Sequence, residues 1–107
     1  QKAKEAYRSG DYNKSAYLYS KLDNDKAKYN QANSLYKQKR YDKALELYNQ
    51  VKDKTIIQKA LYNAGNCYVK LKQYDKAIKK YEEALKLDPS DKDAKYNLEL
   101  LLKRNNK

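Results

Sequence analysis

Apolar residues recur at steps of three or four along most of the chain, the spacing that places them on one face of an α-helix. The clearest run lies in the middle of the chain and consists of Ile57, Leu61, Ala64, Tyr68 and Leu71. The pattern predicts an all-α chain. The expected helices cover residues near 2–9, 12–22, 26–38, 42–52, 56–71, 75–87 and 92–104.

Local signals predict where two of these helices begin and end. Thr55 and Gln58 have the spacing of a capping box, in which two side chains bond free N–H groups at the start of a helix. Asp88-Pro89-Ser90 predicts the end of the helix over 75–87, because proline cannot continue a helix and restricts the residue before it.

Short motifs recur at a nearly constant spacing. Tyr41-Asp42-Lys43-Ala44 returns 33 residues later as Tyr74-Asp75-Lys76-Ala77, whereas the first copy of the unit precedes the second by only 29 residues. We therefore predict one domain with a shortened first repeat. Its parts are a partial repeat over 1–24, full repeats over 25–57 and 58–91, and a capping helix with its tail over 92–107. The Lys- and Asn-rich end over 103–107 is expected to fray.

Small residues occupy the positions at which paired helices would cross. Ala32 and Gly65 are equivalent on the first helices of two repeats, and Ala44 and Ala77 are equivalent on the second helices. A large side chain at such a crossing would push the helices apart. We therefore expect Gly65 to pack against Ala77.

The last predicted helix has the features of a cap. Glu99 takes the position of the small crossing residues, which is tolerable only where no further helix packs. Leu98, Leu101 and Leu102 are expected to cover the exposed side of the helix over 75–87.

The segment over 61–89 resembles the tetratricopeptide repeat. It reads L-x2-A-G-x2-Y from Leu61, A-x3-Y from Ala77 and then Pro89, beside the family pattern W-x2-L-G-x2-Y, A-x3-F, P. The resemblance implies an α-solenoid of antiparallel helix pairs in a right-handed superhelix. It also implies a concave groove, lined by the first helix of each pair, that binds a protein or peptide.

A closer resemblance is to the tetratricopeptide segment of bacterial aerotolerance (Bat-type) proteins. It rests on the short first repeat, on Tyr-Asn-x-(Ala/Gly)-Asn at 29–33 and 62–66, and on residues 94–99. In that family such segments accompany von Willebrand A domains and membrane helices. The resemblance therefore implies part of a bacterial cell-envelope protein, located in the periplasm or the envelope. Without this resemblance, a cytoplasmic location stays open. The lack of Met and a start at Gln1 inside an expected helix favour a segment of a longer chain.

Residue types that commonly carry chemistry are scarce. The chain has no His and a single Cys, so His-based triads, internal disulfides and CxxC zinc sites are excluded by counting. Cys67 is expected to be a small packed residue. Glu82 and Glu83 are adjacent on an exposed helix face and do not converge. We expect no enzyme activity, cofactor, metal site or small-molecule substrate, and no membrane insertion by this segment.

The formal net charge is +11, from 25 Lys and Arg against 14 Asp and Glu. Such a surface attracts acidic partners, although Lys is also a common solubilising residue on helix faces. Lys interleaved with 13 Tyr could instead bind single-stranded nucleic acid by stacking. This partner is disfavoured because many of the rings fall at packing positions, namely Tyr19, Tyr48, Tyr68 and Tyr81. A structural spacer or a self-association unit stays open as an alternative.

By resemblance, the groove residues can be assigned one by one. They are Lys4, Tyr7, Arg8, Tyr29, Asn30, Asn33, Tyr36, Lys37, Lys59, Tyr62, Asn63, Asn66, Lys70, Tyr96 and Asn97. Asn30 with Asn33, and Asn63 with Asn66, lie three apart on one helical face. Each amide can donate and accept, which suits the backbone of an extended peptide. The same amides could instead bond a neighbouring helix and set the repeat spacing.

Some tetratricopeptide domains hold the C-terminal carboxylate of a peptide in a clamp of Lys, Asn and Arg. Only Asn30 and Lys59 match that clamp here. Asn63 stands at the clamp Arg position, Lys4 stands at the second Asn position, and the leading Lys position lies before Gln1. A complete clamp is therefore not expected.

Overall fold

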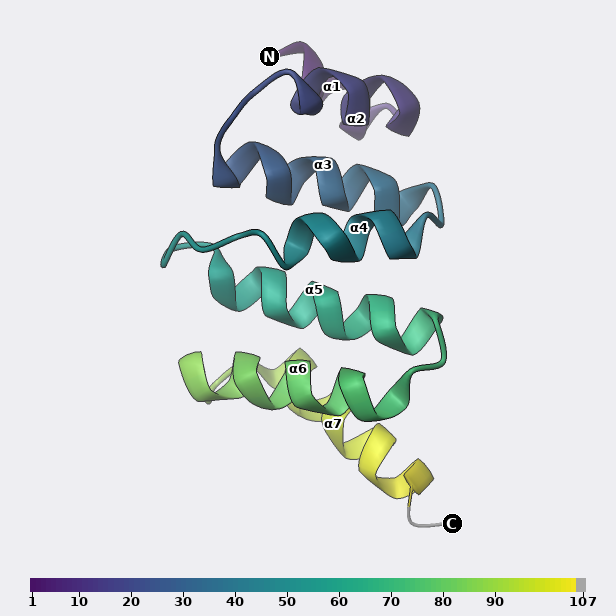
Figure 1. Ribbon diagram of the computed structural model, residues 1–107, viewed down its shortest axis with the longest axis vertical. Helices are drawn as coiled ribbons and strands as arrows, with labels where there is room; N and C mark the ends of the chain where they lie inside the picture. Colours follow the sequence, from purple (N-terminus) through teal and green to yellow (C-terminus); the bar gives the residue numbers. More distant parts are fainter. Residues whose placement is uncertain (106–107) are drawn as a thin grey trace.

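The computed structural model describes residues 1–105, which form seven α-helices and no strand. The helices are α1 (Lys2–Arg8), α2 (Tyr12–Ser20), α3 (Asp25–Lys37), α4 (Tyr41–Tyr48), α5 (Ile57–Lys70), α6 (Tyr74–Leu87) and α7 (Lys92–Asn105). They stack one after another along the long axis, with α1 at one end and α7 at the other (Figure 1). The predicted all-α solenoid is confirmed.

Each helix packs mainly on the helices before and after it in the chain, so the core is a row of small clusters. Three equivalent tyrosines supply its bulk, and Tyr19, Tyr48 and Tyr81 are 6%, 3% and 1% exposed. Alanines surround these rings because α2, α4 and α6, the second helices of the repeats, lie close to their neighbours. The predicted packing role of these rings is confirmed, and Tyr68 is partly buried in the last cluster.

The turn from the first to the second helix of each repeat contains one residue with left-handed backbone. Gly10, Lys39 and Lys72 have φ angles of 85°, 62° and 60°. The three positions are equivalent in the repeat. Only the first has the glycine that such a conformation favours, because an L side chain there crowds the backbone.

The prediction for the helix over 42–52 is wrong at its C-terminal end. Helix α4 ends at Tyr48, and the chain then turns so that Val51 is 2% exposed. Asp25 on α3 holds this connection, because its Oδ2 accepts hydrogen bonds from the backbone N–H of Lys52 at 2.7 Å and of Asp53 at 2.8 Å. These bonds lower the pKa of Asp25.

The predicted capping box is also wrong. Helix α5 begins after Ile56 with no side-chain cap. Thr55 donates its hydroxyl hydrogen bond to Asp53 instead, at 2.6 Å. Gln58 Nε2 donates to Oδ2 of Asp91, the residue directly before α7, at 2.7 Å.

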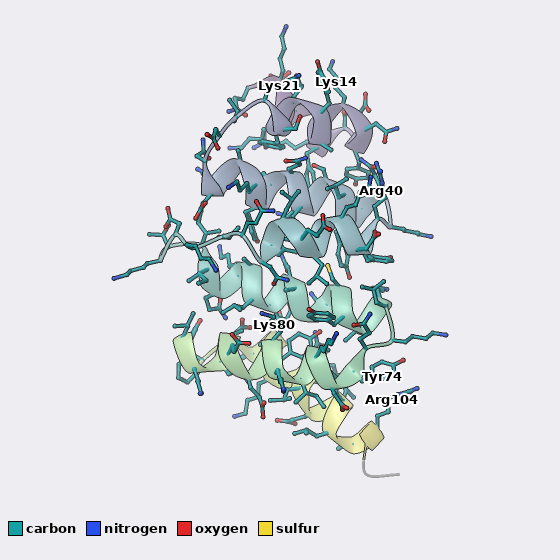
Figure 2. The ribbon with its side chains drawn as sticks, viewed as in Figure 1. Lys14, Lys21, Arg40, Tyr74, Lys80 and Arg104 are labelled. Carbon is teal, nitrogen blue, oxygen red and sulfur yellow. The ribbon has the colours of Figure 1, made fainter. Side chains whose placement is uncertain are left out.

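Helix α7 covers α6 with a narrower stripe than expected. Leu98 and Leu101 pack against Ala77 and Tyr81, but Leu102 is 43% exposed, so its predicted role is wrong. Arg104 lies over the ring of Tyr74, 4.4 Å from its centroid (Figure 2). The helix therefore continues into the segment expected to fray, whose last two residues, 106–107, lie outside the described residues.

The small residues lie at helix crossings, and Ala32, Ala44 and Ala77 are fully buried. The side chain nearest to Gly65, however, is that of Tyr81, one helical turn beyond Ala77. Cys67 is also fully buried, as expected. No helix within residues 1–105 has the length and apolar character needed to cross a bilayer.

Candidate binding groove

The predicted groove residues all lie on α1, α3, α5 and α7, the first helices of the repeats and the cap. They divide by exposure into two groups. Most of the tyrosines and all of the asparagines are half-buried and form a floor: Tyr7, Tyr29, Asn30, Asn33, Tyr36, Tyr62, Asn63, Asn66 and Asn97. The exposed remainder is mostly basic and consists of Lys4, Arg8, Lys37, Lys59, Lys70 and Tyr96.

Three hollows follow one another along this face. The N-terminal hollow, of 290 Å³, is lined by Gln1, Lys4, Tyr19, Leu22, Asn24, Lys26, Ala27 and Asn30. The central hollow, of 230 Å³, is lined by Tyr7, Asn33, Tyr36, Lys37, Tyr48, Asn63 and Asn66. The C-terminal hollow, of 180 Å³, is lined by Tyr36, Asn66, Val69, Lys70, Tyr81, Asn97, Leu100 and Leu101. Tyr36 and Asn66 belong to the last two, so these are continuous.

A larger hollow of 510 Å³ lies outside this face, between α2, α3 and α4. It contains none of the predicted groove residues, and it is lined by Asn13, Ala16, Tyr17, Ser20, Gln31, Leu35, Gln38, Arg40, Lys43, Glu46 and Leu47. Its rim carries Glu46 beside Arg40 and Lys43, so it is less uniformly basic than the groove.

Asparagines on successive helices are joined by hydrogen bonds on the groove floor. Asn33 Oδ1 accepts from the hydroxyl of Tyr48 and from Asn63 Nδ2, the latter at 3.2 Å. Asn63 Nδ2 also donates to the hydroxyl oxygen of Tyr29 at 3.2 Å. This rung links α3, α4 and α5.

The equivalent residues of the next repeat form a second rung. Asn66 Oδ1 accepts from the hydroxyl of Tyr81 at 2.5 Å and from Asn97 Nδ2 at 3.4 Å. Asn97 Nδ2 also donates to the hydroxyl oxygen of Tyr62 at 3.1 Å. We call these two rungs the Tyr–Asn ladder. It ties α3 to α5 and α5 to α7, which is the repeat-spacing role that sequence analysis left open.

The ladder also determines which amide atoms remain free. Asn33 and Asn66 use their oxygens in the rungs, so each keeps an unbonded Nδ2 donor, while Asn63 keeps an unbonded Oδ1 acceptor. No buried side-chain nitrogen or oxygen of the described residues lacks a partner. The free amide atoms are therefore reached by solvent. A structural role and a ligand-binding role are compatible at these positions.

The first repeat lacks this rung. Lys4 stands where the next repeats have Asn33 and Asn66, and Lys has no acceptor atom. The amide of Asn30 and the hydroxyl of Tyr19 consequently have no side-chain partner among residues 1–105. Both line the N-terminal hollow beside Lys4. That hollow is rich in donors and has no carboxylate in its lining.

Burial raises the pKa of three tyrosine hydroxyls in this region and of the Cys67 thiol. It raises the pKa of Tyr36 to about 12, and it also raises the pKa of Tyr48 and of Tyr81. It raises the pKa of Cys67 to about 12, so this thiol is a poor nucleophile at neutral pH. Within residues 1–105 no group of Cys, Asp and Glu is placed to hold a metal ion.

Positive charge is concentrated on the first helices. Helices α1, α3 and α5 carry Lys2, Lys4, Arg8, Lys26, Lys28, Lys37, Lys59 and Lys70, but their only acidic residues are Glu5 and Asp25. Asp25 binds the backbone N–H groups of Lys52 and Asp53. On α2, α4 and α6 the two signs are nearly balanced, with Lys14, Lys43, Lys76, Lys79, Lys80 and Lys86 against Asp42, Glu46, Asp75, Glu82 and Glu83.

Sequence reasoning missed eleven of the residues that line the three hollows: Gln1, Tyr19, Leu22, Asn24, Lys26, Ala27, Tyr48, Val69, Tyr81, Leu100 and Leu101. Tyr19 was interpreted as packing only. Leu100 could have been found from the repeat spacing, because it follows Asn66 by 34 residues, as Tyr96 follows Tyr62.

Comparison with known proteins supports the repeat assignment. Two sequence models, each described as tetratricopeptide repeat, match residues 25–54 and 59–91. No curated protein sequence matches the chain significantly.

Several solved structures are similar in fold. The first TPR of Spaghetti (RPAP3), bound to the HSP90 peptide SRMEEVD, has a TM-score of 0.89 and 22% identity over 99% of this chain and 89% of that one. The TPR2AB domain of yeast Sti1 in its pHSP90 complex has a TM-score of 0.87 and 20% identity, over 97% and 45% of the two chains. The Arabidopsis OM64 TPR domain has a TM-score of 0.85 and 25% identity, over 94% and 88%.

Proposed function

The chain belongs to the tetratricopeptide repeat family, and we propose that it is a non-catalytic module that binds an acidic, extended segment of a partner protein in the groove. The observation that carries this proposal is the unneutralised positive charge of α1, α3 and α5 around a floor of amides. Similar structures that contain an HSP90 or an HSP70 peptide support a peptide as the ligand.

The free amide atoms suit a peptide main chain. Asn33 and Asn66 offer one N–H donor each, one repeat apart, for carbonyl or carboxylate oxygens of the partner. Asn63 offers an acceptor for a backbone N–H. Because the ladder holds these amides in place, little side-chain entropy is lost when the partner binds.

The missing rung offers a place for a carboxylate of the partner. Asn30 and Tyr19 have unused donors there, and Lys4 adds a positive charge. A carboxylate oxygen would supply the acceptor that Asn33 and Asn66 supply in the other repeats. Since Asn63 replaces the clamp Arg, we expect side-chain and terminal carboxylates to be accepted alike.

Two other hypotheses remain predictions, one about the cellular context and one about a different class of partner. The bacterial cell-envelope context rests on the sequence resemblance alone. Nucleic-acid binding is the weaker alternative, because the rings of Tyr29 and Tyr48 lie 5.9 Å apart and those of Tyr62 and Tyr81 lie 5.8 Å apart, which leaves them little room for bases. Of the tyrosine rings, those of Tyr17 and Tyr96 are largely exposed.

Fluorescence anisotropy with labelled SRMEEVD and its neutral analogue SRMQQVN tests the proposal. We expect the acidic peptide to bind more tightly and to lose affinity as salt rises, because screening weakens the attraction. The key variant combines Asn33→Asp with Asn66→Asp. Each Asp keeps an oxygen for the Tyr hydroxyl but replaces the free donor with a carboxylate oxygen. Affinity should fall about tenfold or more, since two hydrogen bonds are lost.

The matched control combines Lys79→Gln with Lys86→Gln on α6, where both side chains are exposed. It lowers the net charge by the same amount on another face. If this control weakens binding as much as the Asp variant does, the general charge of the surface is responsible and the groove proposal is wrong. Equal binding of both peptides would also contradict it.

A further inference from the structure

We infer that the C-terminal hollow is an apolar subsite of the groove, which accepts one large aliphatic or aromatic side chain of the bound segment. This inference rests on the proposed function, because it takes the occupant to be part of the same acidic peptide. It names a second requirement for that peptide, beyond negative charge.

The first observation is a departure from the repeat pattern at Leu100. The equivalent positions of the two preceding repeats carry Asn33 and Asn66, which form the rungs of the ladder. Leu100 can form no rung, and it is 48% exposed, whereas its neighbour Leu101 is 6% exposed and packs on α6. A single exposed Leu needs no explanation by itself. Here the exposed part of the side chain forms a wall of a hollow.

The second observation is the composition of that hollow. Val69, Leu100 and Leu101 form its apolar side, and the rings of Tyr36 and Tyr81 complete it. The amides at its edge are those of Asn66 and Asn97, which bond to each other in the second rung and keep Asn66 Nδ2 and Asn97 Oδ1 unbonded. No carboxylate lines it. Of the three hollows, it has the most apolar lining.

The third observation identifies the occupant. Tyr36 and Asn66 also line the central hollow, so a chain bound over the free donors of Asn33 and Asn66 reaches the apolar hollow without a break. Lys70 lies at the same rim and favours a segment with acidic residues near the apolar one. A second copy of this basic chain would instead bring like charges together.

The groove consequently has two unlike ends. The N-terminal hollow presents Lys4, Asn30 and Tyr19, all of which can donate, and the C-terminal hollow presents apolar walls. A partner segment with its carboxylates at one end and an apolar residue at the other matches this order. The two ends together select both composition and direction.

A double-mutant cycle tests the inference. The probes are fluorescein-labelled peptides of Ser and Glu that carry one Leu, placed at each position in turn, with an Ala peptide for each placement. We expect certain placements of Leu to improve binding about tenfold over Ala, because filling an apolar pocket has an effect of this order. With Leu100→Asn, which restores the residue type of the preceding repeats, that gain should fall below about threefold.

Leu87→Asn is the matched control, because Leu87 is 56% exposed on α6 and lines none of these hollows. It should leave the full Leu gain. If Leu100→Asn also leaves it, or if no placement of Leu improves binding, the subsite is refuted. The proposed function would still stand in that case, provided the peptides bind in proportion to their Glu content. If none of the acidic peptides binds, both proposals fail together.

Discussion

The ring of Tyr81 fills the space that a side chain of residue 65 would need. A Cβ atom at Gly65 would lie 2.5 Å from Cε1 and 2.7 Å from Cδ1 of that ring. The ring has little freedom to move, because Tyr81 is 1% exposed and its hydroxyl donates to Asn66. Glycine is therefore required at position 65 by a close approach and not by its backbone conformation.

The first prediction follows from this contact. In an open helix Gly→Ala stabilises by roughly 0.5–1 kcal/mol. Gly65→Ala should instead destabilise by about 1–3 kcal/mol, the range for overpacking, and Gly65→Leu should destabilise by more. Chemical denaturation of the purified chain measures the sign. A more stable Gly65→Ala protein would mean that Tyr81 moves aside without penalty.

The second prediction concerns the cap. Leu101→Ala should lower the free energy of unfolding by about 2–4 kcal/mol, because the side chain is buried against Ala77 and Tyr81. Leu102→Ala removes the same atoms from a side chain that is 43% exposed. It should change the free energy of unfolding by roughly 0.5 kcal/mol or less. Similar losses for the two variants would show that α7 is packed differently from the arrangement described above.

The helices and their order could be predicted because the apolar residues of each helix recur at steps of three or four within its own segment of the sequence. The errors occurred where distant residues decide the outcome. Helix α4 ends early because the carboxylate of Asp25 binds the connection that follows it. The capping box is absent because Gln58 bonds Asp91, the residue directly before α7, instead.

The candidate groove shows the same division. Repeat spacing placed Asn33 and Asn66 on the correct face. It could not show that Tyr48 and Tyr81, from other helices, bond their oxygens and leave their nitrogens free. The donor pattern of the groove is a tertiary property, since it depends on which amide atom each rung uses.

The third prediction concerns the turns. Lys39→Gly should stabilise the chain by about 0.5–1 kcal/mol. The left-handed backbone costs an L residue roughly 1–2 kcal/mol, which Gly avoids, but the larger backbone entropy that Gly loses on folding offsets part of this gain. Lys72→Gly should behave alike. Gly10→Ala should destabilise by about 1 kcal/mol through the backbone alone, because a Cβ there would meet no atom within 4 Å.

The control for the turns is Lys43→Gly on α4, which should destabilise by about 1 kcal/mol, as glycine does inside a helix. Thermal denaturation of the four variants separates these effects by sign. Destabilisation by Lys39→Gly and Lys72→Gly, as by Lys43→Gly, would contradict the argument from left-handed backbone.

The last prediction concerns alkaline pH. Burial raises the pKa of Tyr48 and of Tyr81 in the folded chain above the ordinary value of 10.0. In the unfolded chain both phenols ionise near that ordinary value, so above it the unfolded state binds fewer protons than the folded state. Stability is therefore complete below about pH 10 and decreases as the pH rises further. Denaturant unfolding at about pH 8 and about pH 11 measures the difference.

Variants assign this loss to particular rings. Tyr48→Phe and Tyr81→Phe should each be less stable near neutral pH, by about 0.5–1.5 kcal/mol, because a ladder hydrogen bond is lost. Each should also lose less stability between the two pH values than the parent chain, since one titrating group is gone. Tyr17→Phe, whose ring is 60% exposed, should keep the parent profile. If all three variants keep that profile, other groups such as the lysines cause the alkaline loss, and the buried hydroxyls of the ladder do not.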